Sequence, residues 1–279
     1  MIQLPVPADR PLVIFTDLDG TLIDHHTYET RGSEQAMRQL FARGAPLIFC
    51  SSKTFAEQTQ LQRQLEIRQP FIFENGSAAA IPIGFFPEKS YAVSRREADY
   101  DIVEFAHAGA AVLREVLSRF PDIRGFADAS DAELSAATGL SGSALPRARD
   151  RWYTETLLTP LDETQATRIS TGIKPDGFSL SRGGRFYTAQ SDGVDKGKAV
   201  RWMEEMFGKA FTTTPFFAAV GDSPNDRAML QAVELPFLVQ RPDQSWADME
   251  IPGLIRVSGV GPSGFSAAVT LLLEGSVAQ

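Results

Sequence analysis

Hydrophobic runs bounded by polar residues predict buried strands in the first third of the chain. Residues 11–16 (PLVIFT), 45–50 (APLIFC) and 71–76 (FIFENG, with a turn at its end) are short runs typical of buried strands. Amphipathic stretches at 33–43 and 54–66 lie between them and predict helices. Strand, helix, strand, helix and strand in this order indicate a parallel sheet with crossover helices.

The same alternation of strands and helices returns late in the chain, and a segment with a different pattern of predicted elements separates the two blocks. The late elements are a helix at 195–207, a strand at 216–222, a helix at 224–233 and a strand at 236–240. The segment between the blocks predicts a long helix at about 97–119, a helix near 161–172 and a hairpin within 177–190 that turns at Arg182, Gly183 and Gly184. The sequence thus predicts the α/β class, with a Rossmann-like parallel-sheet core formed by residues 1–83 and 191–279 and an inserted α+β cap at 84–190.

Composition narrows the class of protein. The 279 residues carry a formal net charge of −8, which argues against nucleic acid as the main partner because phosphate backbones require a basic surface. The one cysteine, Cys50, ends an apolar run, where it is expected to be buried, and it fits a reducing compartment. The opening residues do not predict a signal peptide, and no apolar stretch approaches the roughly 20 residues of a membrane helix. A cytoplasmic protein without a membrane partner is therefore expected.

Polar side chains gather where predicted strands end or helices begin. The patches are Asp17-Leu18-Asp19-Gly20-Thr21, Ser51-Ser52-Lys53-Thr54, Lys196 and Gly221-Asp222-Ser223-Pro224-Asn225-Asp226. Because the carboxyl ends of parallel strands face one crevice, three of these patches are expected to converge there, and Lys196 at the start of a helix can reach the same crevice. A buried strand normally avoids carboxylates, so Asp17 and Asp19 need either solvent or a cation.

The side chains in these patches suit phosphoryl transfer. Asp17, Asp19 and Asp222 supply oxygen ligands for a hard cation such as Mg²⁺. Ser51 and neighbouring backbone N–H groups can hold phosphoryl oxygens, and Lys196 adds a positive charge. A carboxylate can also act as the nucleophile and form an aspartyl-phosphate, while Asp19 is placed to protonate the leaving oxygen and then to activate water.

In this order the patches resemble the four motifs of the haloacid dehalogenase-like phosphohydrolases. The motifs are DxDGT, a Ser or Thr after the second strand, a downstream Lys and GDSxND. The position of the insertion resembles that of the α/β cap in the sugar-phosphate branch of the superfamily. The resemblance implies that Asp17 is the nucleophile and Asp19 the general acid/base, and that Ser51 and Lys196 bind the phosphate. It also implies that Asp17, Asp222 and the backbone carbonyl of Asp19 bind Mg²⁺. Asn225 and Asp226 would support the metal and Lys196.

Finer features look like those of mannosyl-3-phosphoglycerate phosphatases. They are FENG at 73–76, ATGLSGSALPRARDRWYTETLL at 137–158 and SRGGRFYTAQSDGVDKGKAV at 181–200. The resemblance implies a small phosphorylated glycosyl substrate, which carries a phosphate, a carboxylate and several hydroxyls. Its anionic groups require cationic or N–H-rich partners, and a short polar pair can hold its hydroxyls. The predicted substrate-binding residues are Lys53, Glu74, Asn75, Arg182, Gly183, Gly184 and Arg185.

Several alternatives stay open at this stage. Ser52 competes with Ser51 for the phosphate, and Lys198 competes with Lys196. His25 is predicted to lie in a surface loop rather than to bind metal together with its neighbour. The substrate is a mannosyl or a glucosyl compound, or the enzyme is a broader sugar-phosphate phosphatase; a phosphomutase and a non-catalytic phosphate-ligand sensor are further alternatives. Oligomeric state does not follow from these residues.

Overall fold

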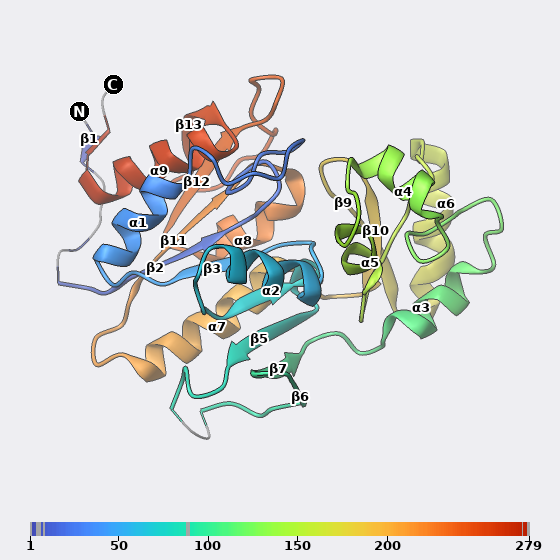
Figure 1. Cartoon of the computed structure of the whole chain (residues 1–279), viewed down its shortest axis with the longest axis horizontal. Helices are drawn as coiled ribbons and strands as arrows, with labels where there is room; N and C mark the ends of the chain where they lie inside the picture. The colour runs from blue at the N-terminus through green and yellow to red at the C-terminus, as the bar shows by residue number, and fades with distance from the viewer. Residues whose placement is uncertain (1, 4–6, 8, 88–89, 275, 278–279) are drawn as a thin grey trace.

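A sheet of nine strands forms the larger part of the molecule. In the computed structural model, which describes residues 2–3, 7, 9–87, 90–274 and 276–277, its strands follow the order β13-β12-β11-β2-β3-β4-β5-β7-β6 (Figure 1). The strands are β2 (Leu12–Thr16), β3 (Leu47–Cys50), β4 (Phe71–Phe73), β5 (Ala78–Pro82), β6 (Arg95–Glu97), β7 (Tyr100–Glu104), β11 (Phe216–Gly221), β12 (Leu235–Gln240) and β13 (Ile255–Val260). A separate short pair, β1 (Ile2–Gln3) and β14 (Ser276–Val277), joins the two ends of the chain.

The order of the strands creates a crevice at the middle of the sheet. Strands β13 to β4 are parallel, whereas β5, β7 and β6 form an antiparallel edge. Strand β2 lies between β11 and β3, so the chain order reverses between β2 and β11. In an open parallel sheet such a reversal opens a crevice at the carboxyl ends of the strands. The residues that follow β2 and β11 therefore meet at one place.

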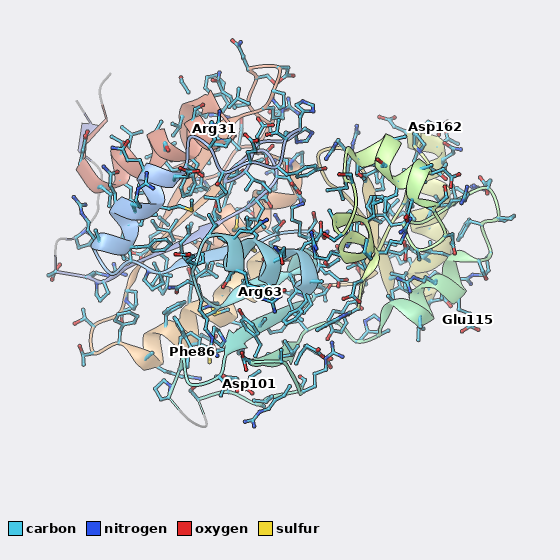
Figure 2. The ribbon with its side chains drawn as sticks, in the orientation of Figure 1. Arg31, Arg63, Phe86, Asp101, Glu115 and Asp162 are labelled. Carbon is cyan, nitrogen blue, oxygen red and sulfur yellow. The ribbon has the colours of Figure 1, made fainter. Side chains whose placement is uncertain are left out.

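Helices cover both faces of the large sheet. One face packs against α1 (Glu34–Ala42), α2 (Phe55–Gln64) and α9 (Pro262–Glu274), and the other against α7 (Lys196–Ala210) and α8 (Arg227–Ala232). Alternate residues of one strand enter opposite cores, as Ile14 and Phe15 do, which explains why the central strands are continuous apolar runs. Figure 2 shows how side chains fill the layers, including Phe86, whose ring centroid lies 5.0 Å from that of Phe207 on α7.

A smaller α+β unit lies beside the large sheet (Figure 1). Its antiparallel sheet has the order β8-β10-β9. Its elements are α3 (Ala110–Leu117), α4 (Asp131–Thr138), α5 (Ala144–Arg149), β8 (Glu155–Thr156), α6 (Glu163–Ile173), β9 (Phe178–Arg182) and β10 (Tyr187–Ser191), so the predicted hairpin is present. Three 3₁₀ turns complete the chain, η1 (Glu74–Gly76), η2 (Lys174–Asp176) and η3 (Pro224–Asp226). Within the described ranges, no helix is both long and apolar enough to cross a membrane.

The long helix predicted at about 97–119 is wrong over its first half. Residues 95–104 form the β6–β7 hairpin, which turns through Ala98 at a φ of 48°, and a helix occupies only Ala110–Leu117. Both strands extend the large sheet by pairing beyond β5, so this sheet continues past residue 84, where the predicted cap begins. The division of the chain into core and cap domains otherwise stays a prediction.

Candidate active site

Asp17 and Asp222 meet where the strand order reverses. Thr16 of β2 and Val220 of β11 are in register, and the Asp17 N–H donates to the Val220 carbonyl at 3.0 Å. Carboxylate oxygens of Asp17, Asp222 and Asp226 all lie within 4.8 Å of one another. Gly20 permits this approach: its φ is 82°, and a Cβ there would lie 2.8 Å from Asp222 Oδ2. The residues after two neighbouring strands thus form one buried acidic cluster.

Lys196 is the cation of this cluster. Its ammonium lies 2.6 Å from Asp17 Oδ1 and 2.6 Å from Asp226 Oδ1, and the residue is 1% exposed. The other oxygen of Asp226 accepts the backbone N–H groups of Asp222 and Ser223, so Asp226 orients both the lysine and the β11 loop. Lys198, the rival considered above, instead turns its ammonium to the carbonyl of Gly193.

The charges of the cluster do not balance, because three carboxylates face one ammonium. Burial raises the pKa of Asp17 to about 7; Lys196 opposes this rise and Asp226 adds to it. Burial, together with Asp226 and Asp17, also holds the pKa of Asp222 well above its usual range. For Lys196 burial works in the opposite direction, but Asp17 and Asp226 outweigh it and raise the pKa. A further cation would relieve this repulsion.

Asp19 adds an unsatisfied oxygen beside the cluster. Its Oδ1 lies 3.1 Å from the Lys53 ammonium, without the geometry of a hydrogen bond, and it is buried with no hydrogen-bond partner among the described residues. Oxygen-only donors with an excess of negative charge are the ligand set of a hard divalent cation. The residues present therefore fit a metal ion of this kind, as the sequence predicted.

The loop after β3 and the turn after β4 lie together at the edge of this cluster. Asn75, at a φ of 57°, donates its N–H to the Ser51 carbonyl, and its side-chain oxygen lies 3.5 Å from Asn225 Nδ2. Ser51 is 1% exposed, and its hydroxyl accepts the Lys53 N–H. Ser52, rather than Ser51, is among the residues that line the open cavity. Phosphate binding by Ser51 stays a prediction.

A cavity with about 810 Å³ of empty volume, which includes space open to solvent, separates the acidic cluster from the α+β unit. Its lining combines carboxylates on the side of the large sheet with cationic, hydroxyl and aromatic side chains. The residues are Asp17, Asp19, His25, Tyr28, Ser52, Lys53, Glu57, Asn75, Phe126, Thr138, Leu140, Ala148, Arg151, Thr156, Gly183, Gly184, Arg185, Phe186, Thr188, Asp222, Ser223 and Asn225. The large sheet and the α+β unit thus both supply side chains to this cavity, and the carboxylates come from the side of the large sheet.

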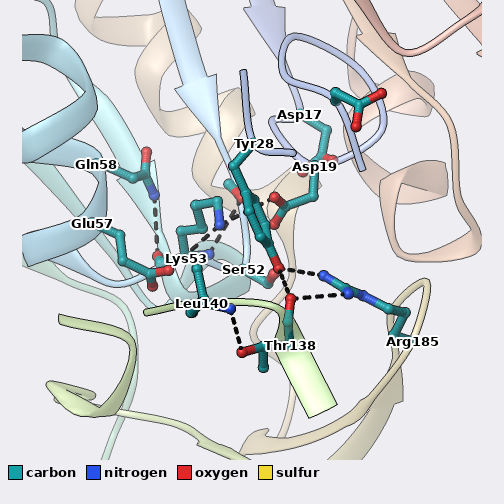
Figure 3. Close-up of polar contacts among 12 residues, drawn as sticks. Asp17, Asp19, Tyr28, Ser52, Lys53, Glu57, Gln58, Thr138, Leu140 and Arg185 are labelled. Atoms are coloured by element: carbon teal, nitrogen blue, oxygen red, sulfur yellow. Dashed lines mark hydrogen bonds and ion pairs between the residues drawn. The ribbon is translucent and has the colours of Figure 1, made fainter. Parts of the chain in front are cut away.

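Tyr28 joins the two halves across this cavity (Figure 3). Its hydroxyl donates to the Thr138 carbonyl at 2.7 Å and accepts a hydrogen bond from Arg185. The Lys53 ammonium lies 4.7 Å from the centre of the Tyr28 ring, within the range of a cation–π contact. Arg185 and Lys53, both predicted from the sequence, therefore approach the cavity from opposite sides of one tyrosine.

Two predicted substrate-binding residues do not lie in this cavity. Glu74 is fully buried, and its oxygens accept the backbone N–H groups of residues 152–154 and the Thr154 hydroxyl at 2.7–3.0 Å. Both oxygens of Glu74 are thus used within the protein, and its predicted role in holding a sugar hydroxyl stays a prediction. The Arg182 guanidinium lies 5.6 Å from the Tyr187 ring and borders a neighbouring depression, together with Gly183 and Gly184.

Among the cavity residues that were not predicted as site residues are Tyr28, Arg151 and His25. Tyr28 lies outside the quoted motifs, Arg151 lies within the 137–158 segment but was given no role, and His25 was expected in a surface loop. His25 is half-buried, and burial followed by the charge of Arg185 lowers its pKa. Its position a few residues after the DxDGT motif was the signal that could have placed it near the site. For Tyr28 no local signal exists, and the position of both Tyr28 and Arg151 in the cavity depends on how the α+β unit packs on the sheet.

Comparisons with known proteins agree with this arrangement. A profile of haloacid dehalogenase-like hydrolases matches residues 14–107. The sucrose-phosphatase of Synechocystis, solved with sucrose and phosphate, superimposes with a TM-score of 0.62 at 15% identity, over 94% of this chain and 98% of that one. The likeness shows a shared fold. The profile points to the haloacid dehalogenase-like hydrolases, and curated relatives at 30–36% identity over most of the chain show that it belongs to them.

Curated relatives narrow the family. A glucosyl-3-phosphoglycerate/mannosyl-3-phosphoglycerate phosphatase of Methanococcoides burtonii is 36% identical over 94% of this chain and 97% of its own length. A mannosyl-3-phosphoglycerate phosphatase of Pyrococcus horikoshii is 34% identical over 81% of this chain and 90% of its own length. The chain belongs to the mannosyl-3-phosphoglycerate phosphatase family, a branch of the sugar-phosphate phosphatases of this superfamily. It is a phosphoric monoester hydrolase, which confirms the enzyme class predicted above.

Proposed function

We propose that this enzyme releases phosphate from mannosyl-3-phosphoglycerate or its glucosyl counterpart, through an aspartyl-phosphate on Asp17 and with Mg²⁺ as cofactor. The observation that carries the proposal is the buried cluster at the floor of the cavity, in which Lys196 lies 2.6 Å from both Asp17 and Asp226. The substrate class is that of the relatives described above, which are glucosyl- and mannosyl-3-phosphoglycerate phosphatases.

Each residue of the cluster has a role in this reaction. An oxygen of Asp17 attacks the phosphorus and the ester oxygen leaves, taking a proton from Asp19; water, activated by Asp19, then attacks the phosphorus and frees Asp17. Lys196 and the Ser51 loop hold the phosphoryl oxygens. Asp17, Asp222 and the Asp19 carbonyl would hold Mg²⁺, which would neutralise charge on the transferring group. Asn225 and Asp226 keep the β11 loop and Lys196 in place.

Phosphate release from a substrate panel tests this proposal. The panel contains mannosyl-3-phosphoglycerate, glucosyl-3-phosphoglycerate and simple sugar phosphates, each assayed with and without Mg²⁺. We expect Mg²⁺-dependent turnover of a glycosyl-3-phosphoglycerate, and a loss of at least about a thousandfold in kcat for Asp17→Asn, because the nucleophile is removed. Broad turnover of simple sugar phosphates would keep the mechanism and reject the substrate. Transfer of phosphate to a second sugar instead of water would favour a phosphomutase, and no turnover of anything would favour a sensor.

A further inference from the structure

Arg151 is a buried cation without a carboxylate partner. The residue is 8% exposed and lines the cavity from the side of the α+β unit. Its terminal nitrogens donate to the Ser52 carbonyl at 3.3 Å and to the Thr154 hydroxyl at 2.7 Å, and its Nε has no hydrogen-bond partner among the described residues. Its hydrogen-bond partners are neutral, and the carboxylates whose pKa burial raises and its charge lowers, Glu74 and Glu57, lie beyond ion-pair distance. Arginine is rarely buried in this way unless an anion is present or arrives.

The other buried cations of the site are already paired. Lys196 contacts Asp17 and Asp226, and Lys53 lies 3.1 Å from Asp19 and 3.4 Å from Glu57. Arg151 is different, because no described carboxylate lies within ion-pair distance of it. The guanidinium thus has both charge and a donor to offer to a ligand in the cavity.

The position of Arg151 relative to the phosphate loop restricts which anion it can meet. Its hydrogen bond to the Ser52 carbonyl places the guanidinium one residue from Ser51, the predicted phosphate-binding residue. In a 3-phosphoglycerate unit the carboxylate is separated from the phosphate-bearing carbon by a single carbon, so the two anions are bound close together. We propose that Arg151 binds the carboxylate of the glycerate unit and thereby selects acidic phosphate esters. This inference rests on the proposed function and names one further residue of its substrate site.

Paired substrates separate this role from a structural one. One member of the pair is glucosyl-3-phosphoglycerate, and the other is the matching glucosylglycerol phosphate, in which a hydroxymethyl group replaces the carboxylate. For the wild-type enzyme we expect a KM for the acid that is lower by about tenfold or more, because the ester without the carboxylate loses a charge-assisted hydrogen bond. Arg151→Gln should remove this preference by raising the KM of the acid alone. Arg149→Gln is the matched control, since Arg149 pairs with Asp131.

The charge-preserving variant covers the case in which Arg151→Gln does not fold. Arg151→Lys should retain part of the preference for the acid, because the charge stays while the forked geometry is lost. If the variants lose equal activity on the acid and on the ester without the carboxylate, the proposal is overturned, and Arg151 supports the Ser52 loop or contacts the phosphate. A wild-type enzyme that does not distinguish the two esters would overturn it as well.

Inhibition keeps this test separate from the test of the proposed function. If the wild-type enzyme hydrolyses only simple sugar phosphates, the proposed substrate fails. In that case 3-phosphoglycerate and glycerol 3-phosphate are compared as inhibitors of the observed turnover. Stronger inhibition by the acid in the wild type, lost in Arg151→Gln, would still support the carboxylate site. Equal inhibition by both compounds would reject it.

Discussion

Two buried carboxylate sites at the same edge of the large sheet differ in what surrounds them. Asp17, after β2, shares the ammonium of Lys196 with Asp226 and lies beside Asp222. Glu74, after β4, receives three backbone N–H groups and one hydroxyl from residues 152–154. Burial raises the pKa of both acids, and donors oppose the rise in each case. A carboxylate that accepts several backbone N–H groups links two parts of the chain, whereas one that shares a single ammonium with other carboxylates is left to bind a ligand.

Among the variants of this comparison, Asp222→Asn, in the cluster around Asp17, should have the largest effect on activity. Removing one carboxylate from the cluster is expected to lower kcat/KM by at least about a hundredfold, because charge on the transferring phosphoryl group is no longer neutralised. Thermal unfolding with and without Mg²⁺ provides a readout that does not depend on activity: Mg²⁺ should raise the Tm of the wild type but not of the variant. Asp243→Asn, in an exposed loop, is the control. An Mg²⁺-dependent rise in Asp222→Asn would place the metal elsewhere.

Glu74→Gln should weaken the hydrogen bonds by which Glu74 links the large sheet to residues 152–154. A glutamine has one acceptor oxygen instead of two and no charge, so backbone N–H groups of 152–154 lose their partner; we expect a loss of about 2–3 kcal/mol in the free energy of unfolding. Because these groups join the two halves of the site, KM should rise as well. Urea denaturation and steady-state kinetics measure the two effects.

A second buried glutamate provides the control for Glu74. Glu155 is 2% exposed and pairs with Arg114 within the α+β unit. Glu155→Gln should therefore lower stability without changing KM. If both variants change KM equally, Glu74 acts through general stability and not through the junction.

Tyr28→Phe should give a smaller effect, confined to the junction. The variant loses the hydroxyl that bonds to Thr138 and Arg185 but keeps the ring beside Lys53. We expect KM to rise by roughly five- to tenfold and kcat to change less, because the free energy of one or two hydrogen bonds is involved. Tyr91→Phe is the control: its hydroxyl bonds to Asp101, away from the cavity. Equal kinetics for Tyr28→Phe and the wild type would show that the hydroxyl does not contribute to the junction.

Glu204 provides the smallest test, as a partly buried acid outside the site. Burial, with Glu234 adding, raises its pKa to about 7 from a usual 4.5. Between these values the unfolded chain loses its proton first, so the contribution of Glu204 to the free energy of unfolding falls as pH rises from about 4.5 to 7. Glu204→Gln should therefore raise stability relative to the wild type at pH 8 more than at pH 5, as measured by urea denaturation. An equal difference at both pH values would contradict the raised pKa.

Much of the large sheet was predictable, and the reasons for the failures are physical. The runs that became β2, β3 and β11 are apolar because both faces of these strands are covered. The β6–β7 hairpin was missed because β6 is exposed and charged, and because its turn passes through Ala98 without a glycine or asparagine. Pairing of β7 with β5, a tertiary contact, and of β6 with β7 makes these residues strands.

The sequence by itself determined the acidic cluster. Asp17 and Asp222 each follow an apolar strand, and parallel neighbours must bring their carboxyl ends to one crevice. Only the tertiary structure decided which acid links two parts of the chain and which is left to bind a ligand. Glu74 and Asp17 are both acids after a strand, and local sequence does not reveal whether donors will arrive from residues 152–154, nearly 80 positions away. The same holds for Tyr28 and Arg151, because their partners belong to the other half of the molecule.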